Sequence, residues 1–140
     1  MVPKLIVDKS LLTYVMQNIS LSELSEGIKD FESKNIESAF EKFNNILKRD
    51  SKNAYAYYYR ALINDEKKNT QAAINDYINV LKYTKELPIV NYMLAVDYDG
   101  IEKYKEAFKY YSDFVSSYKT EDEYLNYAKS RLEELKPYAS

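Results

Sequence analysis

Residues 73–81 read AINDYINVL, and this stretch carries the pattern that decides the fold. Five of its apolar residues, Ala73, Ile74, Tyr77, Val80 and Leu81, follow a helical spacing. Counted from the first, these positions are i, i+1, i+4, i+7 and i+8, which form one face of an α-helix and not the alternation of a strand. The stretch therefore predicts an amphipathic helix.

The same pattern occurs twice more at a fixed spacing. Residues 39–47 read AFEKFNNIL, and residues 107–115 read AFKYYSDFV. The three stretches begin with Ala39, Ala73 and Ala107, and the spacing is constant because 73 − 39 and 107 − 73 both give 34. Twelve positions before each alanine stands another small residue: Gly27, Ala61 and Ala95. A period of this length indicates stacked helical repeats, and the second small column predicts a helix that approaches its neighbour closely.

This arrangement resembles the tetratricopeptide repeat, a 34-residue helix-turn-helix unit with the pattern W-x2-L-G-x2-Y…A-x3-F…P. The resemblance extends from Ser20 to Glu121, and its best-kept part is A-x3-F, present as Ala39…Phe43, Ala73…Tyr77 and Ala107…Tyr111. The tryptophan column instead holds Glu23, Tyr57 and Asn91, and the proline column holds Ser51, Lys85 and Lys119. The resemblance implies an all-α fold, a right-handed α-solenoid of stacked antiparallel helical hairpins.

We expect one domain made of three repeats and two ends. The repeats are residues 20–53, 54–87 and 88–121, preceded by an N-terminal segment or cap helix (1–19) and followed by a C-terminal capping helix (122–140). First helices are predicted near 21–33, 54–66 and 89–100, second helices near 37–49, 71–84 and 104–118, and a short extra helix over 10–18. Capping boxes are predicted for Ser20 with Glu23 and for Thr120 with Glu123, and a turn at Asp99-Gly100.

Composition argues against catalysis and against nucleic-acid binding. The chain has no histidine and no cysteine, so the commonest general base and the commonest metal ligands are missing. Two glycines cannot build a phosphate-binding loop, and 20 basic against 22 acidic residues leave no basic stripe for nucleic acid. Acidic residues close in sequence, such as Asp97 and Asp99, are interpreted as solvated charge. We expect no enzyme, no catalytic residue, no cofactor, no metal site and no nucleic-acid partner.

The longest uninterrupted apolar run is Leu5-Ile6-Val7, followed by Asp8. It is too short for a membrane span or for the core of a signal peptide. The sequence thus favours a soluble, cytoplasmic chain without direct membrane insertion, and leaves the compartment open.

The resemblance also implies that residues near the start of each first helix, and one and two turns later, face a concave groove. Those columns are apolar or aromatic with an acidic edge: Leu24, Ile28, Phe31, Tyr55, Tyr58, Leu62, Asp65, Glu66, Ile89, Tyr92, Val96 and Asp99. Exposed apolar strips mark interaction sites, and tyrosine gives contact area at low entropy cost. We expect the groove to bind a peptide or helix of another protein, with its acidic residues selecting basic ones.

The best-known subgroup of the family grips a C-terminal carboxylate with lysine, asparagine and arginine side chains. The corresponding columns here hold Leu24, Ile28, Tyr59, Ile89 and Met93, which offer no charged clamp. A receptor of that type is disfavoured, because a carboxylate without donors loses more in desolvation than it gains. Two alternatives stay open. One is a structural module, either a piece of a longer solenoid or a self-associating scaffold that makes contacts through its ends. The other is an accessory domain of an envelope or secretion assembly.

Overall fold

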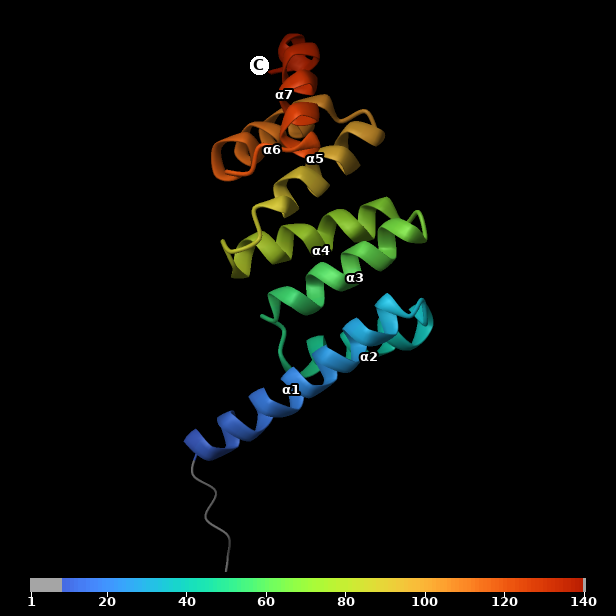
Figure 1. Ribbon diagram of the computed structural model, residues 1–140. Helices are drawn as coiled ribbons and strands as arrows, with labels where there is room; N and C mark the ends of the chain where they lie inside the picture. Colours follow the sequence, from blue (N-terminus) through green and yellow to red (C-terminus); the bar gives the residue numbers. More distant parts are fainter. Residues whose placement is uncertain (1–8, 140) are drawn as a thin grey trace, which may run out of the picture. The chain divides into compact units, whose positions relative to one another are not determined.

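The computed structural model describes the backbone of residues 9–139 and the side chains of residues 20–139 (Figure 1). All regular structure in this part of the chain is helical, which confirms the all-α prediction. The chain divides into two compact units, and the division falls between Ser51 and Lys52. The first eight residues of the expected N-terminal segment lie outside the described residues.

The first unit is a hairpin of α1 (Lys9–Glu32) and α2 (Ile36–Arg49) (Figure 1). Phe43 of α2 is fully buried and lies against Gly27 of α1. A Cβ atom at Gly27 would come within 2.8 Å of Cε1 of Phe43, so a side chain there would force the ring to move. The predicted close approach of the two helices is confirmed at this position.

The beginning of α1 differs from the prediction. The helix runs unbroken through Ser20, so the capping box of Ser20 with Glu23 is wrong, and the helices expected over 10–18 and 21–33 are one element. No proline or glycine interrupts the chain between Lys9 and Gly27, and extending a helix costs far less than nucleating a second one. Glu23 instead accepts a hydrogen bond from Arg49 of α2 at 2.5 Å.

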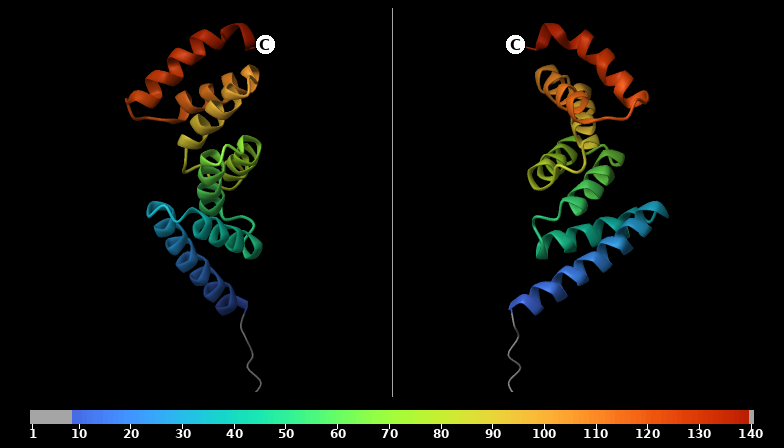
Figure 2. Two further views of the ribbon diagram at one scale, coloured as in Figure 1. Left: turned by 90° about the vertical axis from the view of Figure 1, so that its right-hand side faces the viewer. Right: turned by 60° about the vertical axis from the view of Figure 1, so that its left-hand side comes forward.

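The second unit contains two helical hairpins and a closing helix (Figure 2). Its elements are α3 (Ala54–Glu66), α4 (Thr70–Tyr83), α5 (Ile89–Gly100), α6 (Tyr104–Ser117), α7 (Glu123–Leu135) and the 3₁₀ helix η1 (Lys136–Tyr138). Helix α3 packs against α4, α4 against α5, α5 against α6, and α6 against α7. These bounds agree with the predicted helices to within a few residues.

The repeated columns supply much of the core of the second unit. Eight of their members are fully buried: Ala61, Ala73, Tyr77, Val80, Ala95, Ala107, Tyr111 and Phe114. Leu81, Phe108 and Val115 are half-buried. Helix α7 adds Leu125, Ala128 and Leu135, which pack with the α5–α6 hairpin in one cluster. The prediction that α7 covers the end of the repeats with its apolar side is confirmed for these three residues.

Each hairpin turns through a residue with a left-handed backbone. The angle φ is 65° at Lys34, 60° at Lys68 and 63° at Glu102, and these three positions again follow the repeat period. The next residue donates its backbone N–H to a carbonyl of the first helix, as Asn69 does to Asn64 at 2.8 Å. The turn predicted at Asp99-Gly100 is therefore misplaced: both residues belong to α5, and the backbone hydrogen bonds close the turn without a glycine.

The start of α7 also corrects a prediction. Asp122, and not Thr120, caps the helix, and its carboxylate accepts the N–H of Leu125 at 3.1 Å. The capping box of Thr120 with Glu123 is wrong because Asp122 directly precedes the first helical residue and offers a charged acceptor.

Candidate functional site

The predicted groove residues of the second unit lie on α3 and α5. Tyr55 and Val96 are exposed, with 41% and 38% of their surface accessible. Four others are half-buried against the core: Tyr58, Leu62, Ile89 and Tyr92. Burial raises the pKa of Tyr58, and Tyr59 and Tyr124 add to the shift.

The predicted groove residues of the first unit are Leu24, Ile28 and Phe31. All three are half-buried on α1. In the repeat register, Leu24 corresponds to Tyr58 and Tyr92, since 58 − 24 and 92 − 58 both give 34.

Tyr92 is the centre of an aromatic cluster that joins three helices. Its ring centroid lies 5.3 Å from Phe114 of α6, and 5.2 Å and 6.2 Å from Tyr124 and Tyr127 of α7. The two α7 tyrosines keep 42% and 47% of their surface accessible. We call Tyr92, Val96, Tyr124 and Tyr127 the tyrosine face.

Tyr124 and Tyr127 were missed because the groove was predicted only from first helices of the repeats. A signal was present in the sequence, since both tyrosines stand three positions apart and therefore share one side of α7. Leu125 and Ala128 are the residues that form the packed side of α7 there.

A cavity of 310 Å³ opens beside the tyrosine face. It is lined by two predicted residues of α5, Val96 and Asp99, with Gly100 of the same helix. Tyr111 of α6 and Tyr127 and Arg131 of α7 complete the lining. Arg131 of α7 holds Asp99 through two hydrogen bonds, from Nε at 2.8 Å and Nη2 at 2.7 Å. The Tyr111 hydroxyl donates to the same carboxylate at 3.1 Å. Asp99 is thus not the solvated charge that the sequence suggested.

A pair of aspartates, Asp65 of α3 and Asp97 of α5, forms a second acidic site. Asp65 accepts a hydrogen bond from the Tyr77 hydroxyl at 2.7 Å, and Asp97 lies next to Asp65. Burial, followed by the hydrogen bond and charge of Asp65, raises the pKa of Asp97 to about 8. The Oδ2 atom of Asp97 is buried and has no hydrogen-bond partner among the described residues. The interpretation of Asp97 as solvated charge is therefore wrong. Glu66, the remaining acidic residue of the predicted groove, is exposed.

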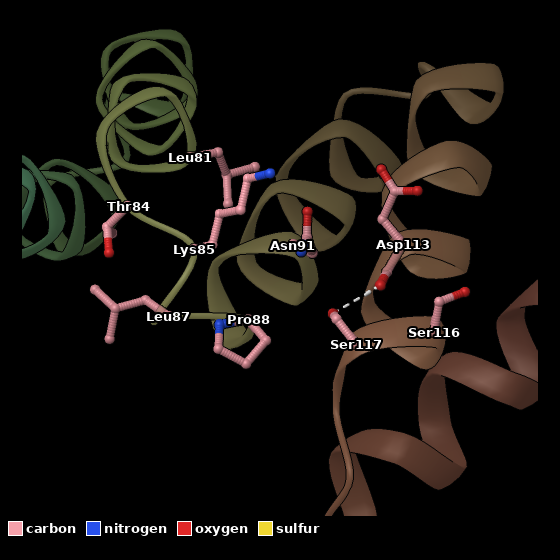
Figure 3. Close-up of a pocket in the computed structure, with 9 residues that line it drawn as sticks. All are labelled: Leu81, Thr84, Lys85, Leu87, Pro88, Asn91, Asp113, Ser116 and Ser117. Carbon is pink, nitrogen blue, oxygen red and sulfur yellow. Dashed lines mark hydrogen bonds between the residues drawn. The ribbon is translucent and has the colours of Figure 1, made fainter.

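Another cleft, of 450 Å³, lies away from these residues (Figure 3). Its lining comes from the end of α4, the α4–α5 connection, the start of α5 and the end of α6: Leu81, Thr84, Lys85, Leu87, Pro88, Asn91, Asp113, Ser116 and Ser117. None of these residues belongs to the predicted groove. The Ser117 hydroxyl donates to the Asp113 carbonyl at 2.8 Å. The lining is mixed, with Lys85 and Asp113 as its charged residues.

The described residues also bear on two other kinds of site. None of the helices between residues 9 and 139 is both long and apolar enough to cross a membrane. In the same part of the chain, no three acidic side chains come together as a metal-binding group would require.

Comparison with known proteins gives matches in fold and not in sequence. No protein-family model matches the chain, and no curated protein matches it. The first TPR domain of Spaghetti (RPAP3), solved with the HSP90 peptide SRMEEVD, has a TM-score of 0.71 and 18% identity over 86% of this chain and 94% of that one. The Arabidopsis OM64 TPR domain has a TM-score of 0.74 and 18% identity over 85% and 98% of the two chains.

The Yersinia enterocolitica type III secretion chaperone SycD, solved with a peptide of the translocator YopD, is also similar. Its TM-score is 0.75 at 14% identity, over 88% of this chain and 96% of that one. The chain therefore has the fold of tetratricopeptide-repeat domains, as the repeated columns predicted.

Proposed function

We propose that this tetratricopeptide-repeat domain is a protein-binding scaffold and not an enzyme, and that its tyrosine face holds a peptide or helix of a partner protein. The observation that carries the proposal is the exposure of Tyr124 and Tyr127 beside Tyr92 and Val96, which gives one apolar surface from two helices. Tyrosine is enriched in protein interfaces because its ring is large, rigid and amphipathic. Tyr55, Tyr58 and Leu62 extend the same class of surface along α3.

Two of the similar structures support the proposal, since RPAP3 and SycD were each solved with a bound peptide. The ligand class of this chain differs from an acidic C-terminal tail such as that of the HSP90 peptide. The columns that would hold a carboxylate clamp contain Tyr59, Ile89 and Met93 in the second unit, which cannot neutralise a buried carboxylate.

Selection from a displayed peptide library tests the proposal with a defined ligand. Peptides recovered on the whole chain should lose at least about tenfold in affinity when Tyr124 and Tyr127 are both changed to alanine. Tyr138→Ala is the matched control, because Tyr138 is also an exposed tyrosine but lies in η1 against Tyr104. If the peptides bind both variants as tightly as the wild type, the binding site is not the tyrosine face.

Self-association is the competing outcome, and light scattering over a range of concentrations distinguishes it. A scaffold that contacts copies of itself through its ends should form oligomers whose fraction rises with concentration. A concentration-independent monomer agrees with the peptide-binding proposal.

A further inference from the structure

The first helices of the second unit carry more acidic than basic residues, although Arg131 pairs with Asp99 and the pKa of Asp97 is raised to about 8. Helices α3 and α5 carry four acidic residues: Asp65, Glu66, Asp97 and Asp99. Their only basic residue is Arg60, which holds the Asp76 carboxylate of α4 through hydrogen bonds of 2.9 Å and 2.7 Å. The lysines of this unit stand on the second helices, in the connections between helices and in the C-terminal part of the chain.

The closing helix does not supply a free cation to the tyrosine face. Arg131 shares one side of α7 with Tyr124 and Tyr127, but its guanidinium is fixed by Asp99 and by Glu134, the latter at 2.6 Å from Nη1. Lys129 follows Tyr127 by two positions, and two positions turn a helix by about 200°. Lys129 therefore projects away from the tyrosine face.

The rings of the tyrosine face also have an acidic neighbour. Burial raises the pKa of Tyr92, and the further contributions come from Tyr127, Tyr124 and the carboxylate of Glu123. The face is thus apolar, aromatic and bordered by negative charge. A cationic side chain gains there from both the ring faces and the carboxylate, whereas an acidic one is repelled.

We propose that the tyrosine face receives an arginine or lysine side chain from a partner segment whose neighbouring residues are apolar. This inference rests on the proposed protein-binding function and names the chemistry of the partner. The cation stacks on the exposed rings of Tyr124 and Tyr127 near Glu123, and the apolar neighbours cover Val96 and Tyr92. Specificity then follows from charge complementarity, because the same surface disfavours an acidic segment.

Three synthetic peptides, each long enough for about four helical turns, test this inference against the whole chain. They share leucines at helical spacing and differ only at four polar positions, which are all arginine, all glutamine or all glutamate. We expect the arginine peptide to bind most tightly, with a loss of about two- to fivefold for each arginine that is replaced by glutamine. Its affinity should fall as salt is raised from about 50 to 300 mM, since exposed charges are screened.

Variants of the chain assign the effect to the rings. The double variant Tyr124→Ala with Tyr127→Ala should lose the preference for the arginine peptide over the glutamine peptide. The double variant Tyr124→Phe with Tyr127→Phe should retain this preference. The control Tyr138→Ala should bind both peptides as the wild type does. Circular dichroism of each variant confirms that it folds.

The outcomes separate this inference from the proposed function. Equal affinity for the arginine and glutamine peptides, lost in the alanine variant, overturns the inference and leaves a peptide-binding face. Undiminished binding of every peptide to the alanine variant overturns both. Absence of saturable binding of the arginine peptide up to about 1 mM overturns the inference, and the peptide selection described above then decides on the function.

Discussion

The hydroxyl of Tyr77 donates a hydrogen bond of 2.7 Å to the carboxylate of Asp65, across the hairpin of α3 and α4. The next repeat makes the same bond between Tyr111 and Asp99, at 3.1 Å. In the first repeat, the two columns hold Phe43 and Phe31, so hydroxyl and carboxylate are absent together. The pair is therefore a polar alternative to an aromatic pair at the same place in the hairpin.

The two tyrosines should differ in what their hydroxyls contribute to stability. Tyr77→Phe removes a donor from Asp65, which has the buried Asp97 beside it, and should lower the free energy of unfolding by about 1–3 kcal/mol. Tyr111→Phe should cost about 0.5–1 kcal/mol, because Asp99 keeps both bonds from Arg131. Urea unfolding of the two variants gives the comparison, and equal losses would contradict it.

The acidic pair Asp65 and Asp97 should make stability depend on pH. A pKa of about 8 for Asp97 in the folded chain is above its ordinary value of 3.8, so the folded chain binds the proton more tightly than the unfolded chain. This contribution is fully present below about pH 4 and is lost as the pH rises to about 8. Asp97→Asn removes the ionisation, so its stability relative to the wild type should increase over that range.

We expect Asp97→Asn to be more stable than the wild type by about 2 kcal/mol at pH 8. This is less than the whole pKa shift would give, because the Asp97 side chain is partly exposed to solvent. Thermal melts between pH 4.5 and pH 9 measure it. Asp113→Asn is the control, because Asp113 is an exposed residue paired with Lys109. A constant difference between Asp97→Asn and the wild type across the range would show that Asp97 is ionised throughout.

The left-handed turn residues offer a stabilising substitution. Lys68 has φ 60°, a left-handed conformation that costs a residue with a Cβ atom about 1–2 kcal/mol. Glycine avoids this cost, but it also makes the unfolded chain more flexible, which offsets part of the gain. Lys68→Gly should therefore raise the free energy of unfolding by about 0.5–1 kcal/mol, and Lys34→Gly and Glu102→Gly should act alike. Thermal melts measure the gain. Lys67→Gly is the control: its φ is −80°, so this change should destabilise.

The sequence predicted the helices and the buried columns because both follow from the repeat period. The same period contained information on Asp97, which stands one full repeat after Ile63, a fully buried residue. Its burial could have been predicted, but not its approach to Asp65, which depends on how α3 and α5 are placed by α4. Tyr127 was missed for a related reason, since α7 lies outside the repeat and its orientation is set by packing on α6.

The three tyrosines of the tyrosine face should differ in how much they contribute to stability and to binding. Tyr92 is half-buried, and its ring lies 5.3 Å from the fully buried Phe114, so Tyr92→Ala should lower the free energy of unfolding by about 2–3 kcal/mol. Tyr124→Ala and Tyr127→Ala remove rings that keep nearly half of their surface in water, and each should cost about 0.5 kcal/mol or less. Urea unfolding measures the costs.

Binding of the arginine peptide should separate the same two classes. The exposed pair can be removed with the fold retained, so a lost affinity in that variant reports on contact with the partner, whereas a loss in Tyr92→Ala combines contact with packing. The ratio of affinity loss to stability loss should accordingly be larger for Tyr124/Tyr127 than for Tyr92. If the exposed pair costs as much stability as Tyr92, these rings are part of the core in solution, and the tyrosine face is not a surface open to a partner.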